Sequence, residues 1–203
     1  MKTINIHQFV QDQLSTWSLA SDNFKALENV HVRHLEVNGL TIKLQFNPAR
    51  MISSAAKLSK EDIARRKCFL CEENRPAVQV NIPYEGVNGH KYHILVNPYT
   101  IFPDHLVVAK STHLQQEISG RYPDMLKLAM SFKECSFFYN GPCCGASAPD
   151  HHHFQAAPRN IMPLENSVDA SLDSIEETGA KSLLNKILAH GDATLYHYDK
   201  FSA

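Results

Sequence analysis

The sequence lacks any long apolar segment. Nowhere do 18 apolar residues follow one another, and residues 1–8 contain no apolar run of the kind that begins a signal peptide. We therefore expect no membrane span and no secretion signal. Cysteine is also sparse: the five cysteines include a single C-x-x-C pair and no second one. An odd number without a secretion signal indicates a reducing compartment, so the expected location is the cytoplasm.

The chain also lacks an excess of positive or negative charge, because its formal net charge is -1. No strong basic field exists to attract nucleic acid, and a duplex-binding protein is not expected, although a site for a single nucleotide remains open. The 203 residues suffice for one domain with a sizeable core. Histidine is what the chain has in excess, with 12 in total and three together at 151–153.

The first part of the chain predicts a helix followed by a β-hairpin. Apolar side chains at helical spacing predict a helix over residues 6–27, broken near 21–23. Two alternating segments, 30–37 and 40–46, meet at Asn38-Gly39, a dipeptide typical of a tight hairpin turn. The alternation predicts that the following side chains share one face and are buried: Leu40, Ile42, Leu44 and Phe46.

The remaining pattern mixes strands and helices. Strands are expected at 93–97, 105–109, 136–139, 152–157 and 194–198, and helices at 59–66, 112–118, 123–133 and 180–190. This order favours an α+β fold on an antiparallel sheet flanked by helices. We expect a helical segment over 1–28, a main α+β domain over 29–162, and a linker, helix and terminal strand over 163–203.

Cys68 and Cys71 can grip one tetrahedral metal ion, because a tight turn brings both sulfur atoms to one point. A redox pair and two buried cysteines are the alternatives. A redox pair normally opens a helix after a strand, whereas this one follows three charged residues at 65–67, which favours zinc. The vicinal Cys143 and Cys144 are poorly placed to complete such a site, so histidines are the candidates for the other two ligands.

The segment His151-x-His153-x-Gln155 is the second constellation. In a strand these three side chains point to one face, and His152 points to the other. A histidine there can attack phosphorus, and the amide two residues on can donate a hydrogen bond to a phosphate oxygen. The small residues that precede it allow backbone N–H groups to approach a phosphate. An adventitious metal patch and a solvated strand are the alternatives.

These motifs together resemble the transferase branch of the histidine-triad superfamily. That branch includes galactose-1-phosphate uridylyltransferase, diadenosine tetraphosphate phosphorylase and GDP-L-galactose phosphorylase. The resemblance covers about residues 40–160, and its segments occur in the order seen in that branch. They are Asn47-Pro48-Ala49-Arg50, the Cys68–Cys71 turn, Val96-Asn97-Pro98-Tyr99, Pro103 to Val108, Asn140-Gly141, Gly145-x-Ser147 and His151 to Gln155.

The resemblance implies a closed, structural zinc site and a nucleophile. The implied zinc ligands are Cys68, Cys71, His113 and His151. His153 is then the nucleophile, with its second ring nitrogen held by a backbone carbonyl. One departure stands out, because six residues separate Ser147 from His153 where the uridylyltransferases have five. Asp150 looks like the insertion, and a slipped register would present His152 to the site in place of His153.

The implied activity is nucleotidyl transfer through a covalent nucleotidyl-histidine. The substrate would be a nucleoside diphosphate sugar or a dinucleoside polyphosphate, and the acceptor a phosphate or sugar phosphate. Gln155 favours transfer over hydrolysis, because an amide cannot move a proton. A hydrolase and a zinc-stabilised nucleotide-binding protein are the alternatives. A second subunit, as in a homodimer, would supply any pocket wall that this chain lacks.

Other residues have roles implied by the same resemblance, each beside a plainer alternative. Asn140 and Ser147 are expected near the phosphate oxygens. Arg50 and Lys57 either face the phosphates or are solvated charges. Asn97 either touches the nucleoside or shapes the turn before Pro98. Of the remaining histidines, His105 is expected to stabilise a strand end.

Overall fold

The computed structural model describes residues 4–37, 40–48, 60–142, 144 and 146–165. Arg50, Lys57, the predicted helix at 180–190 and the predicted strand at 194–198 lie outside these residues. None of the described helices is long and apolar enough to cross a membrane.

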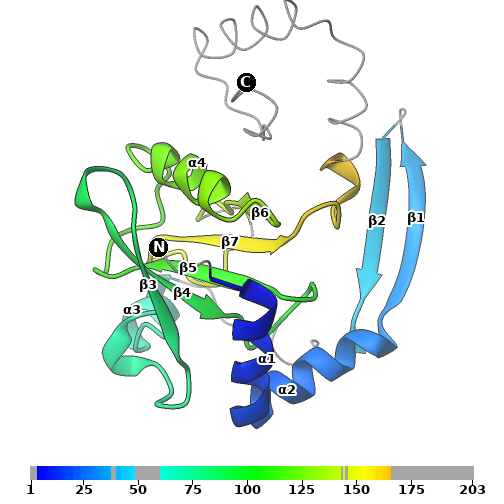
Figure 1. Ribbon diagram of the computed structural model, residues 1–203, viewed down its shortest axis with the longest axis horizontal. Coiled ribbons are helices and arrows are strands. Elements are labelled where there is room, and N and C mark those ends of the chain that lie inside the picture. The colour runs from blue at the N-terminus through cyan, green and yellow to red at the C-terminus, as the bar shows by residue number, and fades with distance from the viewer. Residues whose placement is uncertain (1–3, 38–39, 49–59, 143, 145, 166–203) are drawn as a thin grey trace, which may run out of the picture.

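A five-stranded sheet forms the body of the molecule, in the order β3-β4-β5-β7-β6 (Figure 1). All four pairings in it are antiparallel. The strands are β3 (Asn81–Glu85), β4 (Lys91–Val96), β5 (Leu106–Lys110), β6 (Cys135–Phe138) and β7 (His153–Pro158). The α+β class with an antiparallel sheet flanked by helices is therefore confirmed.

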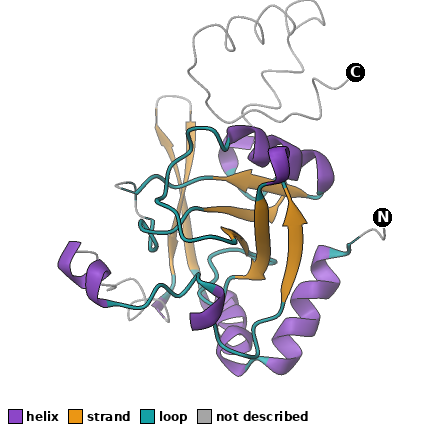
Figure 2. Cartoon of the chain, turned by 90° about the vertical axis from the view of Figure 1, so that its left-hand side faces the viewer, coloured by secondary structure: helices purple, strands orange, loops and turns teal. Residues whose placement is uncertain are grey.

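The two faces of this sheet carry different cores. Helices α1 (Ile6–Thr16) and α4 (Tyr122–Ser131) pack on one face, against a large cluster that includes Phe154 and Ala156 of β7. The other face holds a smaller cluster, formed by Cys68, Leu70, Leu95, Ala109 and Ala148. In Figure 2 the long loops gather on one side of the sheet, while α1 lies on the other. The C-x-x-C turn thus packs on the face opposite the helices.

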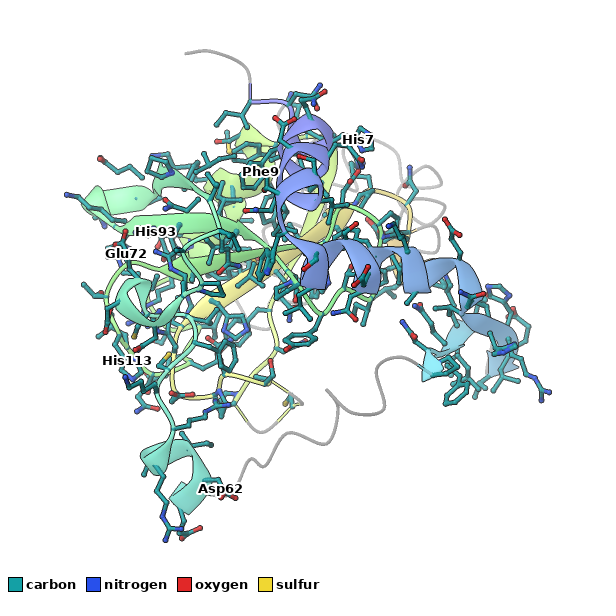
Figure 3. The ribbon with its side chains drawn as sticks, turned by 90° about the horizontal axis from the view of Figure 1, so that it is seen from below. His7, Phe9, Asp62, Glu72, His93 and His113 are labelled. Carbon is teal, nitrogen blue, oxygen red and sulfur yellow. The ribbon has the colours of Figure 1, made fainter. Side chains whose placement is uncertain are left out.

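The N-terminal helix breaks earlier than the sequence predicts. α1 ends at Thr16 and α2 (Ser18–Lys25) follows, because Trp17 between them has an extended backbone with φ -125°. A short 3-10 turn, η1 (Ala26–Asn29), continues α2. Figure 3 shows Phe9 on the side of α1 that faces the sheet, where it packs against the large cluster. The break therefore lies at the buried Trp17, which is 6% exposed, and not at the polar residues 21–23, which belong to α2.

The hairpin forms in the predicted register, but its burial was predicted wrongly. β1 (His31–Val37) and β2 (Leu40–Phe46) pair so that Val37 lies opposite Leu40, which leaves two residues for the turn. They form a separate two-stranded sheet that stands beside the body in Figure 1. Ile42, Leu44 and Phe46 are 42%, 49% and 54% exposed. Alternation set the face correctly, but it carries no information on whether anything covers that face.

Two further segments differ from the sequence prediction. β3 was not predicted, and it contains Pro83, which an edge strand tolerates because one side of it makes no ladder hydrogen bonds. Residues 112–118, predicted as a helix, form an irregular segment instead. The carbonyl of Leu114 in that segment accepts a hydrogen bond from the backbone N–H of His152 at 2.6 Å. The backbone carbonyl of this segment therefore bonds to the residue before β7 instead of to an N–H group within a helix.

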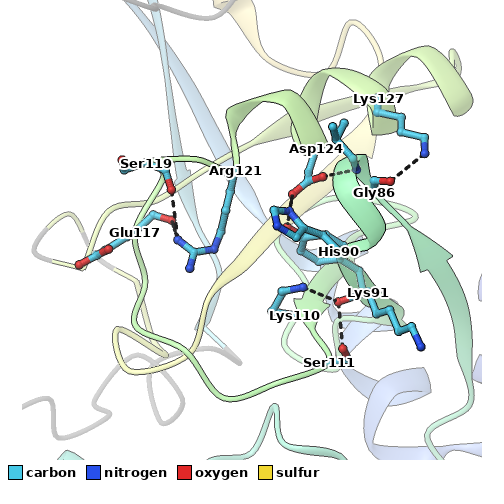
Figure 4. A network of polar contacts seen from close by, with 12 residues as sticks. Gly86, His90, Lys91, Lys110, Ser111, Glu117, Ser119, Arg121, Asp124 and Lys127 are labelled. Carbon is cyan, nitrogen blue, oxygen red and sulfur yellow. Dashed lines mark hydrogen bonds and ion pairs between the residues drawn. The ribbon is translucent and has the colours of Figure 1, made fainter.

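A buried carboxylate joins α4 to the β3–β4 connection (Figure 4). Asp124 accepts hydrogen bonds from the backbone of Val87 at 2.5 Å, from the His90 ring at 2.7 Å and from the Tyr92 hydroxyl at 2.6 Å. Burial opposes its ionisation, yet these donors outweigh burial and hold the pKa of Asp124 below its ordinary value. Gly86 lies so close that a Cβ atom there would come within 2.2 Å of the carboxylate.

Candidate active site and metal centre

Strand β7 carries the candidate nucleophile. His153 lies opposite Ala109 on β5, and Gln155 lies opposite Val107. Phe154 and Ala156, which alternate with them, are fully buried in the large core cluster. Because successive side chains of a strand point to opposite faces, His153 and Gln155 share the face on which the C-x-x-C turn packs.

The ring of His153 has one defined tautomer. Its Nδ1 lies 2.9 Å from the backbone oxygen of His151, and a carbonyl can only accept, so Nδ1 carries the hydrogen. Burial lowers the pKa of His153, a residue that is only 4% exposed, and this favours the neutral imidazole. The neutral ring then holds its lone pair on Nε2, the atom that a nucleophilic histidine uses.

Gln116 braces the backbone of the same residue. Its Oε1 accepts from the N–H of His153 at 2.8 Å, and its Nε2 donates to the His153 carbonyl at 3.0 Å. The same Nε2 donates to the carbonyl of Asn140 at 2.9 Å, so one amide ties β7 to the segment after β6. Sequence reasoning missed Gln116, because a glutamine in an irregular segment carries no signal of its contacts.

Gln155 is held by a second histidine, His105. The backbone N–H of Ile101 donates to Nδ1 of His105 at 3.3 Å, which leaves the ring hydrogen on Nε2. That Nε2 lies 2.9 Å from Oε1 of Gln155, so His105 donates and the Gln155 oxygen accepts. The amide NH₂ of Gln155 is thereby the end turned away from His105. His105 adjoins the start of β5, as expected, and it also orients a candidate site residue.

Two phenylalanines adjoin this pair. The ring of Phe138 stacks on His105 with centroids 6.3 Å apart, and Phe102 meets both rings edge-on. Phe138 lies opposite Gln155 in the β6–β7 pairing and is only half-buried. The run 136–139 is thus not uniformly core: Phe137 belongs to the core and Phe138 to the face of Gln155.

His152 occupies the opposite face of the sheet. It is fully buried, with the rings of Tyr92, Tyr139 and Phe154 at 6.2, 6.1 and 4.8 Å. Neither of its ring nitrogens has a hydrogen-bond partner among the described residues. Burial lowers the pKa of His152 to about 3. In this register His153 lies on the same face as Gln155, and His152 lies on the opposite face.

Four side chains converge on one point beside β7 and can hold a metal ion. The ligand atoms of Cys68, Cys71, His113 and His151 all lie within 4.8 Å of one another. Sγ of Cys68 is 3.2 Å from Nδ1 of His151, and Sγ of Cys71 is 3.3 Å from Nδ1 of His113. Sulfur and nitrogen atoms on one tetrahedral zinc ion stand about 3.6 Å apart. The set predicted from sequence is therefore assembled, and it fits a four-coordinate ion.

The surroundings of the cluster orient its ligands. Nε2 of His151 donates to the carbonyl of Lys110 at 2.8 Å, which leaves Nδ1 free to bind a metal. Figure 3 shows His113 at the edge of the molecule, on the side of the C-x-x-C turn. Its ring meets that of His151 at 90° with centroids 5.1 Å apart.

Arg66 fastens the C-x-x-C turn to the loop before β7. Its guanidinium donates to the carbonyl of Ser147 at 3.0 Å and to Asp150 at 2.9 Å, and it lies over the Phe69 ring. Asp150, the extra residue noted in the sequence, therefore has an ion-pair partner. Ser147 is exposed and takes part in this contact through its backbone carbonyl. Among the described residues, no hydrogen bond joins its hydroxyl to His153.

The β4–β5 loop, residues 97–105, is held by the N-terminal part of the chain. His7 of α1 pairs with Asp104 at 2.8 Å, Asn23 of α2 donates to the Pro98 carbonyl, and Gln45 of β2 donates to the Ile101 carbonyl. Asn97, in the same loop, accepts from the backbone of Tyr99 at 3.0 Å. This contact shapes the turn at Pro98, and Nδ2 of Asn97 lies 3.5 Å from Nε2 of His105.

Solved structures similar to the chain include two from yeast. One is "Ap4A phosphorylase Apa2 in complex with AMP", with 18% identity, 76% of this chain and 52% of that chain covered, and a TM-score of 0.44. The other is "Ap4A phosphorylase Apa2", with 14% identity, 74% and 52% covered, and a TM-score of 0.44. The chain spans about half the length of these solved chains.

No curated protein matches the sequence significantly. A family model described as "Domain of unknown function (DUF4922)" matches residues 9–158. That match extends from α1 to the last residue of β7, and it includes the four converging metal-ligand candidates, His153 and Gln155. The chain therefore belongs to the DUF4922 family.

Proposed function

We propose that this chain is a nucleotidyl-transfer enzyme with His153 as its nucleophile. The observation that carries the proposal is the tautomer of His153, whose Nδ1–H is held by the His151 carbonyl at 2.9 Å. A neutral, buried imidazole with its lone pair on Nε2 is what a nucleophilic histidine requires. A solvent-exposed strand of histidines would leave both ring nitrogens to water.

The proposed reaction has two displacements at one phosphorus atom. Nε2 of His153 attacks the α-phosphorus of a nucleoside diphosphate sugar or dinucleoside polyphosphate, and a P–N bond forms. The P–O bond to the leaving phosphate or sugar phosphate breaks, and its electron pair departs on that oxygen. An oxygen of a phosphate or sugar-phosphate acceptor then attacks the same phosphorus, and the P–N bond breaks.

Gln155 stabilises the charge that develops in both displacements. Because His105 takes its carbonyl oxygen, the amide NH₂ is the end available to a non-bridging phosphate oxygen. An amide neither gives nor takes a proton at neutral pH, so Gln155 does not activate a water molecule. This favours transfer to phosphate over hydrolysis. Asn140, Ser147, Asn97, Arg50 and Lys57 remain candidates for substrate contact.

The metal that best suits the donor set is zinc, with a structural role. Two thiolates and two imidazoles complete a tetrahedral shell without an open position, so the bound ion supplies rigidity and no Lewis-acid chemistry. His151 is one of the four proposed ligands, and its carbonyl also accepts the hydrogen bond from Nδ1 of His153. One residue therefore links the metal site to the ring of the nucleophile. The proposal places the enzyme in the cytoplasm, acting on small nucleotides.

Trapping of the covalent adduct tests the proposal. The protein is incubated with nucleoside diphosphate sugars and diadenosine polyphosphates, quenched at alkaline pH, and its intact mass is measured. We expect an added nucleotide on the wild type, none on His153→Ala, and retention on the neighbouring variant His152→Leu. Product analysis with and without phosphate separates transfer from hydrolysis. Absence of any adduct from folded, zinc-loaded protein, together with nucleotide binding, would instead support a binding protein.

A further inference from the structure

The hydrogen-bond ladder between β6 and β7 is interrupted at the candidate nucleophile. The backbone N–H of Arg159 donates to the Glu134 carbonyl, which marks one hydrogen-bonded pair of this antiparallel register. Such pairs recur at every second residue along each strand, so His153 and Asn140, six residues further on, would form another. β6 ends at Phe138, however, and the backbone of His153 bonds elsewhere.

The side-chain amide of Gln116 takes the place of the missing pair. Its Oε1 accepts from the His153 N–H, and its Nε2 donates to the carbonyls of His153 and Asn140. Two carbonyls require the NH₂ group and the N–H requires the oxygen, so these partners fix the orientation of the amide. The amide thus stands between the two backbones, and we call it the Gln116 wedge.

The backbone of Gln116 is held as firmly as its amide. The residue is 1% exposed. Its carbonyl accepts from the Tyr139 hydroxyl at 2.9 Å, and its N–H donates to the Pro149 carbonyl at 3.4 Å. The Tyr139 ring in turn packs near His152 and Phe154, on the face of the sheet that carries the helices. Contacts at both ends therefore keep the Gln116 wedge in place.

The wedge separates two side chains that would otherwise be in contact. Tyr139 belongs to the helix-bearing face, so alternation places Asn140 on the opposite face, together with His153. In a direct hydrogen-bonded pair the Cα atoms of these two residues would stand about 5.5 Å apart, with their side chains touching. An amide inserted between the strands adds a second hydrogen bond in series and widens the gap beside the His153 ring.

We propose that Gln116 is a positioning residue that holds β6 and β7 apart at His153, so that a phosphoryl group can enter between His153 and Asn140. This role rests on the proposed nucleotidyl transfer. Both amide hydrogens of Gln116 are used by backbone carbonyls. Gln116 therefore acts through the placement of the two strands and not through contact with the substrate.

The rate of adduct formation on His153 tests this role in the full-length, zinc-loaded protein. Gln116→Ala should slow the adduct about 100-fold, because displacement of a reacting group by about 1 Å has an effect of this size. The affinity for the nucleotide should change little, since the group that is lost touches no substrate. A loss of affinity at an unchanged rate would overturn the proposal.

Gln13→Ala is the matched control, because Gln13 is a buried glutamine with the same kind of backbone contacts elsewhere. It is 2% exposed, donates to the Val78 carbonyl and accepts from the Val80 N–H, both at 2.7 Å, in the segment before edge strand β3. We expect a fall in Tm like that of Gln116→Ala but an unchanged adduct rate. Equal rates in the two variants would contradict a positioning role for Gln116.

Crystal structures of the wild type and Gln116→Ala supply a readout that needs no activity. We expect the gap to close in the variant, with the Asn140 carbonyl bonded directly to the His153 N–H. An unchanged separation of the strands would refute the wedge. Gln116→Asn, which keeps the amide but is one methylene shorter, should narrow the gap and serves where Gln116→Ala does not fold. Absence of an adduct on the wild type would refute the proposed function, and the closure of the gap would then decide the wedge by itself.

Discussion

At the scale of single residues, two adjacent histidines on β7 have opposite environments. His153 has a carbonyl on Nδ1, and its backbone is bound by Gln116. His152 lies among aromatic rings, and within the described part of the chain neither of its ring nitrogens has a hydrogen-bond partner. Alternation along a strand predicts that the two face apart. It does not predict which one enters the core, because that depends on the register set by Ala109 opposite His153.

We expect His152→Leu to stabilise the folded protein. Burial of a polar ring without hydrogen bonds costs roughly 1–3 kcal/mol, and leucine fills a similar volume without polar atoms. The loss of ring contacts with Tyr92 and Phe154 offsets part of this gain. A rise in Tm of a few degrees by calorimetry, with zinc content unchanged, is the expected result. A clear fall in Tm would show that the ring nitrogens have a partner.

We expect His105→Phe to slow nucleotidyl transfer by about 10- to 100-fold, because a misoriented group at the reaction centre has an effect of this size. Phenylalanine keeps the stack on Phe138 but removes the donor that fixes Gln155. The measurement is the rate of adduct formation on His153, with KM as the second readout. Since His105 acts through Gln155, the double variant with Gln155→Ala should be no slower than Gln155→Ala alone. Additive losses would show that His105 has a separate role.

At the scale of elements, the sequence predicts what depends on local pattern and misses what depends on distant partners. The Asn38-Gly39 dipeptide predicted the hairpin and its register, and the strands expected at 93–97, 105–109 and 152–157 correspond to β4, β5 and β7. Residues 112–118 have a helical pattern, but their backbone is used by the start of β7 through Leu114. The roles of Gln116 and His105 come from contacts 37 and 50 residues away in sequence, which no local pattern encodes.

The junction between α4 and the β3–β4 connection leads to a stability prediction. We expect Gly86→Ala to destabilise the protein by about 1–3 kcal/mol, a typical cost of overpacking. The new Cβ would stand 2.2 Å from the Asp124 carboxylate, so α4 must shift or its hydrogen bonds must lengthen. Urea unfolding measures the change. The control is Gly141→Ala, where the nearest atom to the new Cβ is the Cys144 sulfur at 3.5 Å, an ordinary contact, so its unfolding midpoint should change much less.

The same carboxylate makes stability depend on pH. The pKa of Asp124 is lowered in the folded state by its three donors, so the stabilisation is complete above the ordinary carboxyl pKa and is lost as pH falls through the lowered value. Urea midpoints measured between pH 5 and pH 3 should therefore fall. Asp124→Asn should be less stable at pH 5 and show a smaller fall. An equal slope in the two proteins would mean that other groups control the acid response.

At the scale of the whole molecule, the four residues that can hold a metal ion join segments that are far apart in the sequence. They connect the turn at 68–71, the segment after β5 and the start of β7. The sequence supplied the C-x-x-C pair unaided, but His113 and His151 followed only from resemblance to a family. Spacing alone did not distinguish them among 12 histidines.

Metal removal should therefore destabilise the entire domain. Loss of about 3 kcal/mol would lower Tm by roughly 6–12 °C for a protein of this size. Elemental analysis should find one zinc per chain, and a strong chelator or Cys71→Ser should remove it with a matching fall in Tm. The exposed Cys144 lies outside the cluster, so Cys144→Ser should change neither quantity. A chelated protein with unchanged Tm would contradict a structural role.

The order of the four ligands along the chain has a consequence for biosynthesis. A ribosome delivers Cys68, Cys71 and His113 well before His151, which lies two residues ahead of β7, the last of the described strands along the chain. Synthesis of the roughly 40 intervening residues takes about 2–8 seconds at ordinary translation rates. During that interval the nascent chain exposes two thiols and one imidazole without their fourth partner. Oxidants and competing metals have their best access to the thiols during that interval. With zinc as the proposed ion, fast translation and available zinc would therefore raise the fraction of chains that fold with the correct metal.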